Sequence, residues 1–226
     1  MNIYEKVIGD LKSASDAKYK SFNDKIAMTK LQTLGVRVPD IKRIAKSVPK
    51  EEIENYLADC EFCFYEDTLV YGLLLARLDF ETLWKRKDEY LSRCDSWGLV
   101  DCFVPSIKVG RLEKEIFYRD IMNEIAEKSD FFLRFDIVAL LDFFVGGEHT
   151  SEILRTVEKL DGRGYYNDMA IAWLVSVAFV KGREETLEFL KNNSLGVFTH
   201  NKAISKINDS LRVSDSDKKY LKTIRK

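Results

Sequence analysis

The chain has 226 residues, of which 46% are hydrophobic and 32% charged, a composition typical of a globular protein with a sizeable core. The formal net charge of -1 excludes a uniformly basic, nucleic-acid-binding surface, so any basic patch must arise from an uneven distribution of Lys and Arg. Three prolines and eleven glycines favour long helices joined by simple loops.

No secretory signal is predicted, because residues 1–6 show no basic segment followed by an apolar one. The most continuous apolar run, Met169 to Val180, is shorter than the roughly 20 residues that a membrane-spanning helix needs. We therefore expect a cytoplasmic protein that does not associate with a membrane.

Apolar residues recur at helical spacing along the chain, and no useful stretch alternates with period two. The pattern predicts an all-α fold. The expected helices cover residues 3–14, 16–33, 40–47, 50–59, 67–78, 80–93, a helix that begins near 96, 111–128, 131–145, 150–160, 165–181, 183–192, 199–212 and 214–225.

Four aspartates, at positions 67, 101, 136 and 168, each precede an apolar helical run, at separations of 34, 35 and 32 residues. A unit of about 35 residues accommodates two helices and their turns, which is typical of a helical solenoid. We expect residues 1–226 to form one array of stacked antiparallel helix pairs with a concave inner face.

Near the middle of the chain, Trp97 and Asp101 lie four residues apart and should share one face of a helix, with Lys108 one turn further on. Alone, this pattern is also explained by a solvated aspartate and a partly buried tryptophan. Asp95 or Ser96 should cap the helix. Pro105 removes the amide that would bond the carbonyl of Asp101, which predicts a kink. The core side of the helix should be formed by Val100, Phe103, Val104 and Ile107.

Two further candidates lie on the helices expected to occupy equivalent places in the next repeats. Arg134 interrupts the apolar stretch 131–138, where its guanidinium must reach water, a carboxylate or a ligand. Trp173 lies on a helix that is apolar nearly all round, so plain core packing also explains it.

A basic cluster follows the breaker at residues 35–39 and is formed by Arg37, Lys42, Arg43 and Lys46. It could contact phosphates or simply be a solvated helix face.

The sequence predicts no metal site. Cys60 and Cys63 form a single C-x-x-C pair without a second one, so reduced buried thiols are the simpler interpretation. His149 and His200 are far apart and show no spacing typical of a metal site or a catalytic triad.

Taken together, these segments resemble the AlkD-like DNA alkylation repair glycosylases, a family with HEAT-like repeats. The resemblance covers nearly the whole chain and rests on five segments in this order: GVRVPDIKRIAK (35–46), SWGLVD (96–101), LRFDIV (133–138), YYNDMAIAW (165–173) and NKAISKI (201–207).

The resemblance implies a C-shaped, right-handed α-solenoid whose concave groove binds duplex DNA carrying alkylated bases. Asp101 matches the family's catalytic carboxylate, Trp97 and Trp173 its groove tryptophans, and Arg134 its groove arginine. Members of the family excise cationic N3- and N7-alkylpurines without flipping the base into a pocket.

The chemistry suits these residues. An alkylated purine that carries a positive charge leaves without a general acid, so a carboxylate need only stabilise the oxocarbenium-like sugar and position a water. The tryptophans can offer cation–π contacts, and Arg134 can hold a phosphate. No metal or other cofactor is required. The residues expected to gather DNA phosphates are Arg37, Arg43, Lys46, Lys108 and Lys202.

Two alternatives remain. A non-catalytic solenoid could bind damaged or branched DNA through the same groove without using Asp101. A protein-interaction scaffold would instead present an acidic or apolar groove. A groove binder of this size needs no partner subunit, so we expect a monomer.

Overall fold

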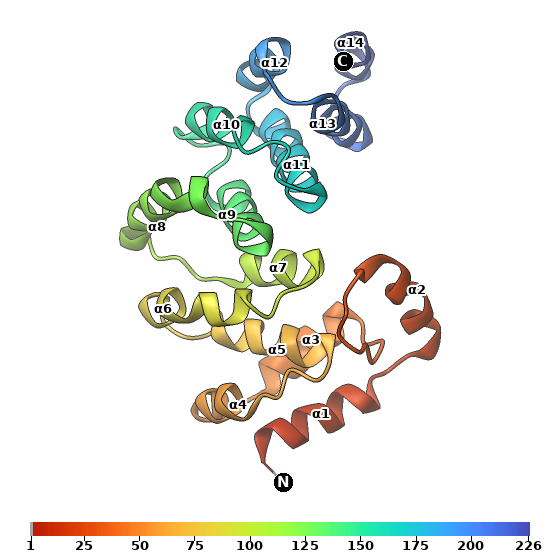
Figure 1. Cartoon of the computed structure of the whole chain (residues 1–226), viewed down its shortest axis with the longest axis vertical. Helices are drawn as coiled ribbons and strands as arrows, with labels where there is room; N and C mark the ends of the chain where they lie inside the picture. The colour runs from red at the N-terminus through yellow and green to blue at the C-terminus, as the bar shows by residue number, and fades with distance from the viewer. Residues whose placement is uncertain (1) are drawn as a thin grey trace. The chain divides into compact units, whose positions relative to one another are not determined.

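The computed structural model describes residues 2–226, of which Figure 1 gives an overview. The chain is 73% helical, and no β-strand occurs in the part of it that the structure describes. One isolated bridge joins Gln32 and Phe64. The predicted all-α class is confirmed. None of the helices within residues 2–226 is both long and apolar enough to span a bilayer.

The chain divides between Lys114 and Glu115 into two compact units. Each unit has its own buried core, and each is described below by itself. The single C-shaped array of HEAT-like repeats over residues 1–226 stays a prediction.

The first unit is organised around α5, whose eleven residues are all buried. Helices α3 and α7 pack against α5, as do α4 and α6 (Figure 1). The helices of this unit are α1 (Ile3–Ser13), α2 (Ala17–Ala27), α3 (Val38–Ser47), α4 (Ile53–Asp59), α5 (Tyr65–Leu75), α6 (Phe80–Leu91) and α7 (Trp97–Phe103), with short 3₁₀ turns at Lys50–Glu52 and Val104–Ser106.

In the second unit α11 is the central helix, in contact with α9, α10, α12 and α13 (Figure 1). Its apolar residues point in nearly every direction, because neighbours surround it. The helices are α8 (Arg111–Glu124, which begins just before the boundary), α9 (Asp130–Phe143), α10 (Thr150–Glu158), α11 (Tyr165–Lys181), α12 (Arg183–Asn192), α13 (Val197–Asp209) and α14 (Asp215–Thr223), with a 3₁₀ turn at Ile125–Glu127.

The four periodic aspartates fall on alternate helices: Asp67 on α5, Asp101 on α7, Asp136 on α9 and Asp168 on α11. This agrees with a repeating unit of two helices. The aspartates do not occupy equivalent positions within their helices. Their spacing therefore reflects the length of a helix pair, and the four side chains do not share one structural role.

The largest error in the expected helix bounds concerns α2, which ends at Ala27 instead of residue 33. Met28 adopts a left-handed conformation with a φ of 51°, which stops the helix. The next residues bond elsewhere: Thr29 and Lys30 donate to Asp95, and the carbonyl of Gln32 accepts from the amide of Tyr65. Tertiary contacts therefore compete with the helical pattern here.

Candidate functional site

Trp97 and Asp101 occupy successive turns of α7, and both side chains are partly exposed. The expected core residues Val100, Phe103, Val104 and Ile107 are buried on the other side. The indole Nε1 of Trp97 donates a hydrogen bond of 3.0 Å to the carbonyl of Ile26, at the end of α2. The helix thus presents a tryptophan of fixed orientation one turn before a carboxylate.

The residues just before α7 attach it to the same segment. Ser96 is the N-cap, as predicted, but its hydroxyl donates to the carbonyl of Ala27 and makes no capping bond to its own helix. The carboxylate of Asp95 accepts from the hydroxyl of Thr29 and the amide of Lys30, each at 2.6 Å. The entry to α7 is therefore held by side chains that bond to residues 26–30.

Two tyrosines hold α7 from its buried side. The hydroxyl of Tyr90, on α6, donates to the carbonyl of Leu99 at 3.1 Å, and its ring contacts Phe103 with centroids 4.7 Å apart. The hydroxyl of Tyr65, on α5, approaches Gly98 so closely that a Cβ at that position would overlap it. Gly98 is therefore required for the close approach of α5 and α7 beside Asp101.

The proline prediction is refined by the structure. The α-helix ends at Phe103, and Pro105 lies in a 3₁₀ turn, so the change in helix type takes the place of a kink within one helix. Lys108 is exposed in the loop that precedes α8. It therefore does not continue the face of Trp97 and Asp101 along the same helix.

The charges near Asp101 come from three helices. Burial raises the pKa of the Cys102 thiol; the positive charge of Lys42, on α3, opposes that rise, and the charge of Asp101 adds to it. Burial also raises the pKa of Tyr65, with smaller contributions from Cys102 and Asp101. The Cys102 thiol, next to Asp101, is thus subject to opposing charges from α3 and from its own helix.

A buried carboxylate positions the start of α3. Glu66, on α5, is fully buried, and its oxygens accept from the amides of Leu34, Gly35 and Val36 at 2.8–3.2 Å. Gly35 has a φ of 80°, a conformation that glycine adopts without strain. The predicted breaker is therefore a loop folded around one anion, and it fixes where the basic helix begins.

The predicted DNA-contact residues of α3 differ in the ion pairs that they form within the protein. Arg37 forms an ion pair with Asp16 at 3.3 Å and lies over the ring of Tyr19 at 4.5 Å. Arg43 pairs with Asp40 on its own helix at 2.8 Å. Lys46 is exposed, and no carboxylate of residues 2–226 lies within ion-pair distance of it. Lys46 is thus the member most readily available to a phosphate.

In the second unit, Arg134 and Trp173 lie on neighbouring helices, α9 and α11. Arg134 is only 5% exposed, and its Nη1 donates to the carbonyl of Tyr166 in the first turn of α11. The Arg134 side chain therefore helps to attach α9 to α11. Trp173 is half-buried two turns along α11, and Lys202 is half-buried on α13.

The cysteine pair is not buried as a whole. Cys60 is partly buried and Cys63 exposed, and neither forms a disulfide. Burial raises the pKa of Cys60 to about 12, which keeps its thiol protonated at neutral pH.

Two contributors to the site were not predicted from the sequence: Tyr65, against Gly98, and Glu66, beneath the loop before α3. The glycine in the first turn of an otherwise apolar helix is the signal that could have indicated a close approach. Two exposed aromatic side chains were also missed, Tyr165 at the start of α11 and Phe198 at the start of α13, with centroids 5.8 Å apart.

A comparison with protein families identifies one match. The sequence model of the family described as DNA alkylation repair enzyme matches residues 7–207, a range that extends over most of each unit. Neither the comparison with curated proteins nor that with solved structures gives a significant match. Because the match extends over most of the chain, the protein belongs to the family of DNA alkylation repair enzymes.

Proposed function

We propose that this protein is a DNA glycosylase that hydrolyses the N-glycosidic bond of N3- or N7-alkylated purines in duplex DNA. Membership of the DNA alkylation repair family supports a role in the repair of alkylated DNA. The observation that carries the proposal is the arrangement on α7, where a partly exposed Asp101 follows a tryptophan anchored through its indole nitrogen.

Asp101 acts on the sugar. As the bond between C1′ and the purine nitrogen breaks, its electron pair leaves with the base and neutralises the positive charge of the alkylated ring. Positive charge then develops on the sugar, where the carboxylate of Asp101 stabilises it. A water adds to C1′ and loses its proton to Asp101, which completes hydrolysis without a metal or other cofactor.

The tryptophans act on the base. A cationic purine is attracted to the face of an indole, by about 0.5–2 kcal/mol for each contact. Trp97 keeps its ring in place through Ile26, so little entropy is lost when a lesion binds. Trp173 offers a second, half-exposed indole.

Phosphates are held by Lys46, Lys108, Lys202 and the paired Arg37 and Arg43. Arg134 contributes by positioning the first turn of α11, where it donates to the carbonyl of Tyr166. We further propose that the two units form a C-shaped solenoid, that DNA lies in its concave groove with the lesion left in the stack, and that the protein acts as a monomer in the cytoplasm.

The decisive test is release of a single N7-methylguanine from duplex DNA in the presence of a chelator. The wild type should release the base faster than spontaneous depurination, and Asp101→Asn should fall to the spontaneous rate while still binding the duplex. Asp10→Asn, at an exposed position of α1, is the matched control and should behave as the wild type.

Each alternative has its own outcome in the same experiment. Tight binding with release at the spontaneous rate by the wild type would favour a non-catalytic reader of damaged DNA. Neither binding nor release would leave the protein-interaction scaffold.

A further inference from the structure

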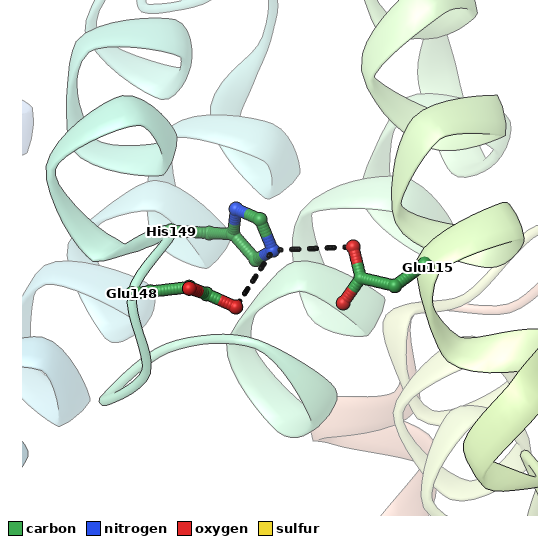
Figure 2. Close-up of side chains that lie close together, drawn as sticks. All are labelled: Glu115, Glu148 and His149. Carbon is green, nitrogen blue, oxygen red and sulfur yellow. Dashed lines mark ion pairs between the residues drawn. The ribbon is translucent and has the colours of Figure 1, made fainter.

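Three potential metal ligands converge in the second unit, and none of them has a role in the proposed glycosylase chemistry. Glu115 lies on α8, and Glu148 and His149 lie in the turn between α9 and α10. One carboxylate oxygen of each glutamate and one ring nitrogen of the histidine all lie within 4.8 Å of one another. Figure 2 shows the three side chains directed toward one another. No other such group of three occurs among the residues that the structure describes.

The central atom of the group is Nε2 of His149. It lies 3.6 Å from Oε2 of Glu115 and 4.0 Å from Oε1 of Glu148, both too far for a hydrogen bond (Figure 2). The nitrogen is shielded from solvent and makes no hydrogen bond with residues 2–226. The two carboxylates lie within ion-pair distance of this nitrogen but beyond hydrogen-bond reach, which leaves room for a bound group between them.

These distances suit an ion between the ligands. Zinc binds nitrogen and carboxylate oxygen at about 2.0–2.2 Å in a tetrahedral arrangement, which separates two ligands by about 3.4 Å. The two separations from Nε2 of His149, 3.6 and 4.0 Å, are longer than this, and both glutamate side chains are exposed and able to turn inward.

The histidine, by contrast, is held in place. Its ring stacks on that of Tyr118, on α8, with centroids 3.8 Å apart and planes 20° apart. The hydroxyl of Tyr118 donates in turn to Glu152, on α10, at 2.8 Å. One rigid donor and two adjustable carboxylates are therefore arranged around one point, which lowers the cost of ordering a metal site.

We propose that Glu115, Glu148 and His149 bind one divalent cation of the zinc class. Magnesium and calcium prefer ligand sets made entirely of oxygen, whereas an imidazole with two carboxylates suits zinc and leaves a fourth position for water. The two carboxylates neutralise the charge of the ion. The bound ion links α8 to the turn before α10, which strengthens the contact that Tyr118 already makes.

The test uses the full chain, stripped of metal with a chelator and titrated with zinc chloride in a calorimeter. We expect one zinc ion per chain. Glu115→Gln and Glu148→Gln should each weaken zinc binding about tenfold or more, and His149→Phe, which keeps a ring against Tyr118, should abolish stoichiometric binding. Glu127→Gln, at an exposed glutamate of the same unit outside the group, should bind as the wild type does.

Cobalt(II) separates this site from the cysteines. Bound through oxygen and nitrogen, cobalt shows its visible bands without the near-ultraviolet absorption that a sulfur ligand adds, and Cys63→Ser leaves the affinity unchanged. Zinc should also raise the midpoint of thermal unfolding of the wild type but not of His149→Phe. The proposal is overturned if the wild type binds no stoichiometric zinc, if His149→Phe binds it equally well, or if Cys63→Ser removes the binding.

Discussion

The indole nitrogen of Trp97 donates a hydrogen bond to the backbone carbonyl of Ile26, 3.0 Å away, and so joins the first turn of α7 to the end of α2. The side chain proposed to meet the lesion is therefore also a structural link. An alanine variant of Trp97 would therefore be ambiguous. Its activity could fall because the contact with the lesion is lost or because the hydrogen bond to Ile26 is lost.

The variant Trp97→Phe separates the aromatic contact with the lesion from the hydrogen bond to Ile26. Phenylalanine keeps an aromatic face but cannot donate to Ile26, so the free energy of unfolding should fall by about 1 kcal/mol, the value of one hydrogen bond. Base release should fall further than this stability loss explains, since an unanchored ring has to be ordered by the lesion. Denaturant unfolding and single-turnover release check the two effects, and unchanged release would show that the anchor does not matter for catalysis.

Gly98→Ala should disturb the site through the contact between α7 and α5. The new Cβ would overlap the hydroxyl of Tyr65, and relief of such overpacking typically costs about 1–3 kcal/mol. Because α7 must shift to accommodate it, base release should also slow. The matched control is Gly9→Ala on α1, where a Cβ would meet nothing within 4 Å and where alanine should stabilise the helix by about 1 kcal/mol. Equal unfolding midpoints for the two variants would contradict the prediction.

Glu66→Gln should be strongly destabilising. The amide of glutamine would turn a donor toward some of the three backbone amides at residues 34–36 that now share the carboxylate, at a cost of about 2 kcal/mol or more. Glu51→Gln, at an exposed position, serves as the control and should change the unfolding midpoint in urea very little. A small effect in both variants would mean that the loop tolerates the loss of its anion.

Lys46→Ala should weaken duplex binding. It should also make the plot of the logarithm of the binding constant against the logarithm of the salt concentration less steep by about 0.9, the contribution of one phosphate contact. Lys85→Ala is the control, because Lys85 lies on α6 and pairs with Glu81 at 2.6 Å. Fluorescence anisotropy at several salt concentrations measures both slopes. If the salt dependence of Lys46→Ala equals that of the wild type, Lys46 does not belong to the proposed interface.

Acid should loosen the C-terminal part of the chain through His200. Its Nε2 donates to the carbonyl of Ile224 at 2.9 Å, and its Nδ1 lies 3.1 Å from Nδ2 and 3.3 Å from Oδ1 of the Asn193 side chain. Burial lowers the pKa of His200 below its ordinary value of about 6.5. The unfolded chain therefore binds the proton more readily, and stability falls as the pH drops from about 6.5 toward the lowered pKa.

The measurement for His200 is urea unfolding between pH 5 and 7.5. His200→Gln should flatten the pH dependence in this range, since glutamine does not titrate. A wild-type pH profile in His200→Gln would assign the effect to another group.

Much of the fold could be predicted because helical periodicity is a local property. The bounds of α11 and α12 agree with those expected, and the core side of α7 was placed correctly. The end of α2 was not predictable in this way, because Thr29, Lys30 and Gln32 bond to partners more than 30 residues away. Sequence spacing alone contains no information about such contacts.

The candidate site shows the same limit. The spacing of Trp97 and Asp101 predicted a shared helical face, and the structure places both on α7. The anchoring of Trp97 by Ile26 and the support of Gly98 by Tyr65 depend on residues distant in sequence, and neither was foreseen. The group at His149 was missed for the same reason, since Glu115 lies 34 positions before the histidine.

The buried carboxylate of Glu66 also sets an order of assembly. It reaches back 31 residues to Gly35, and the indole of Trp97 reaches back 71 residues to Ile26. A growing chain leaves the ribosome from its N-terminus, so α2 and α3 emerge long before the groups that complete them. Contacts of such high sequence separation also slow folding. The contacts that complete α2 and α3 therefore cannot form until α5 and α7 have been synthesised, so these two helices stay incompletely packed during that part of synthesis.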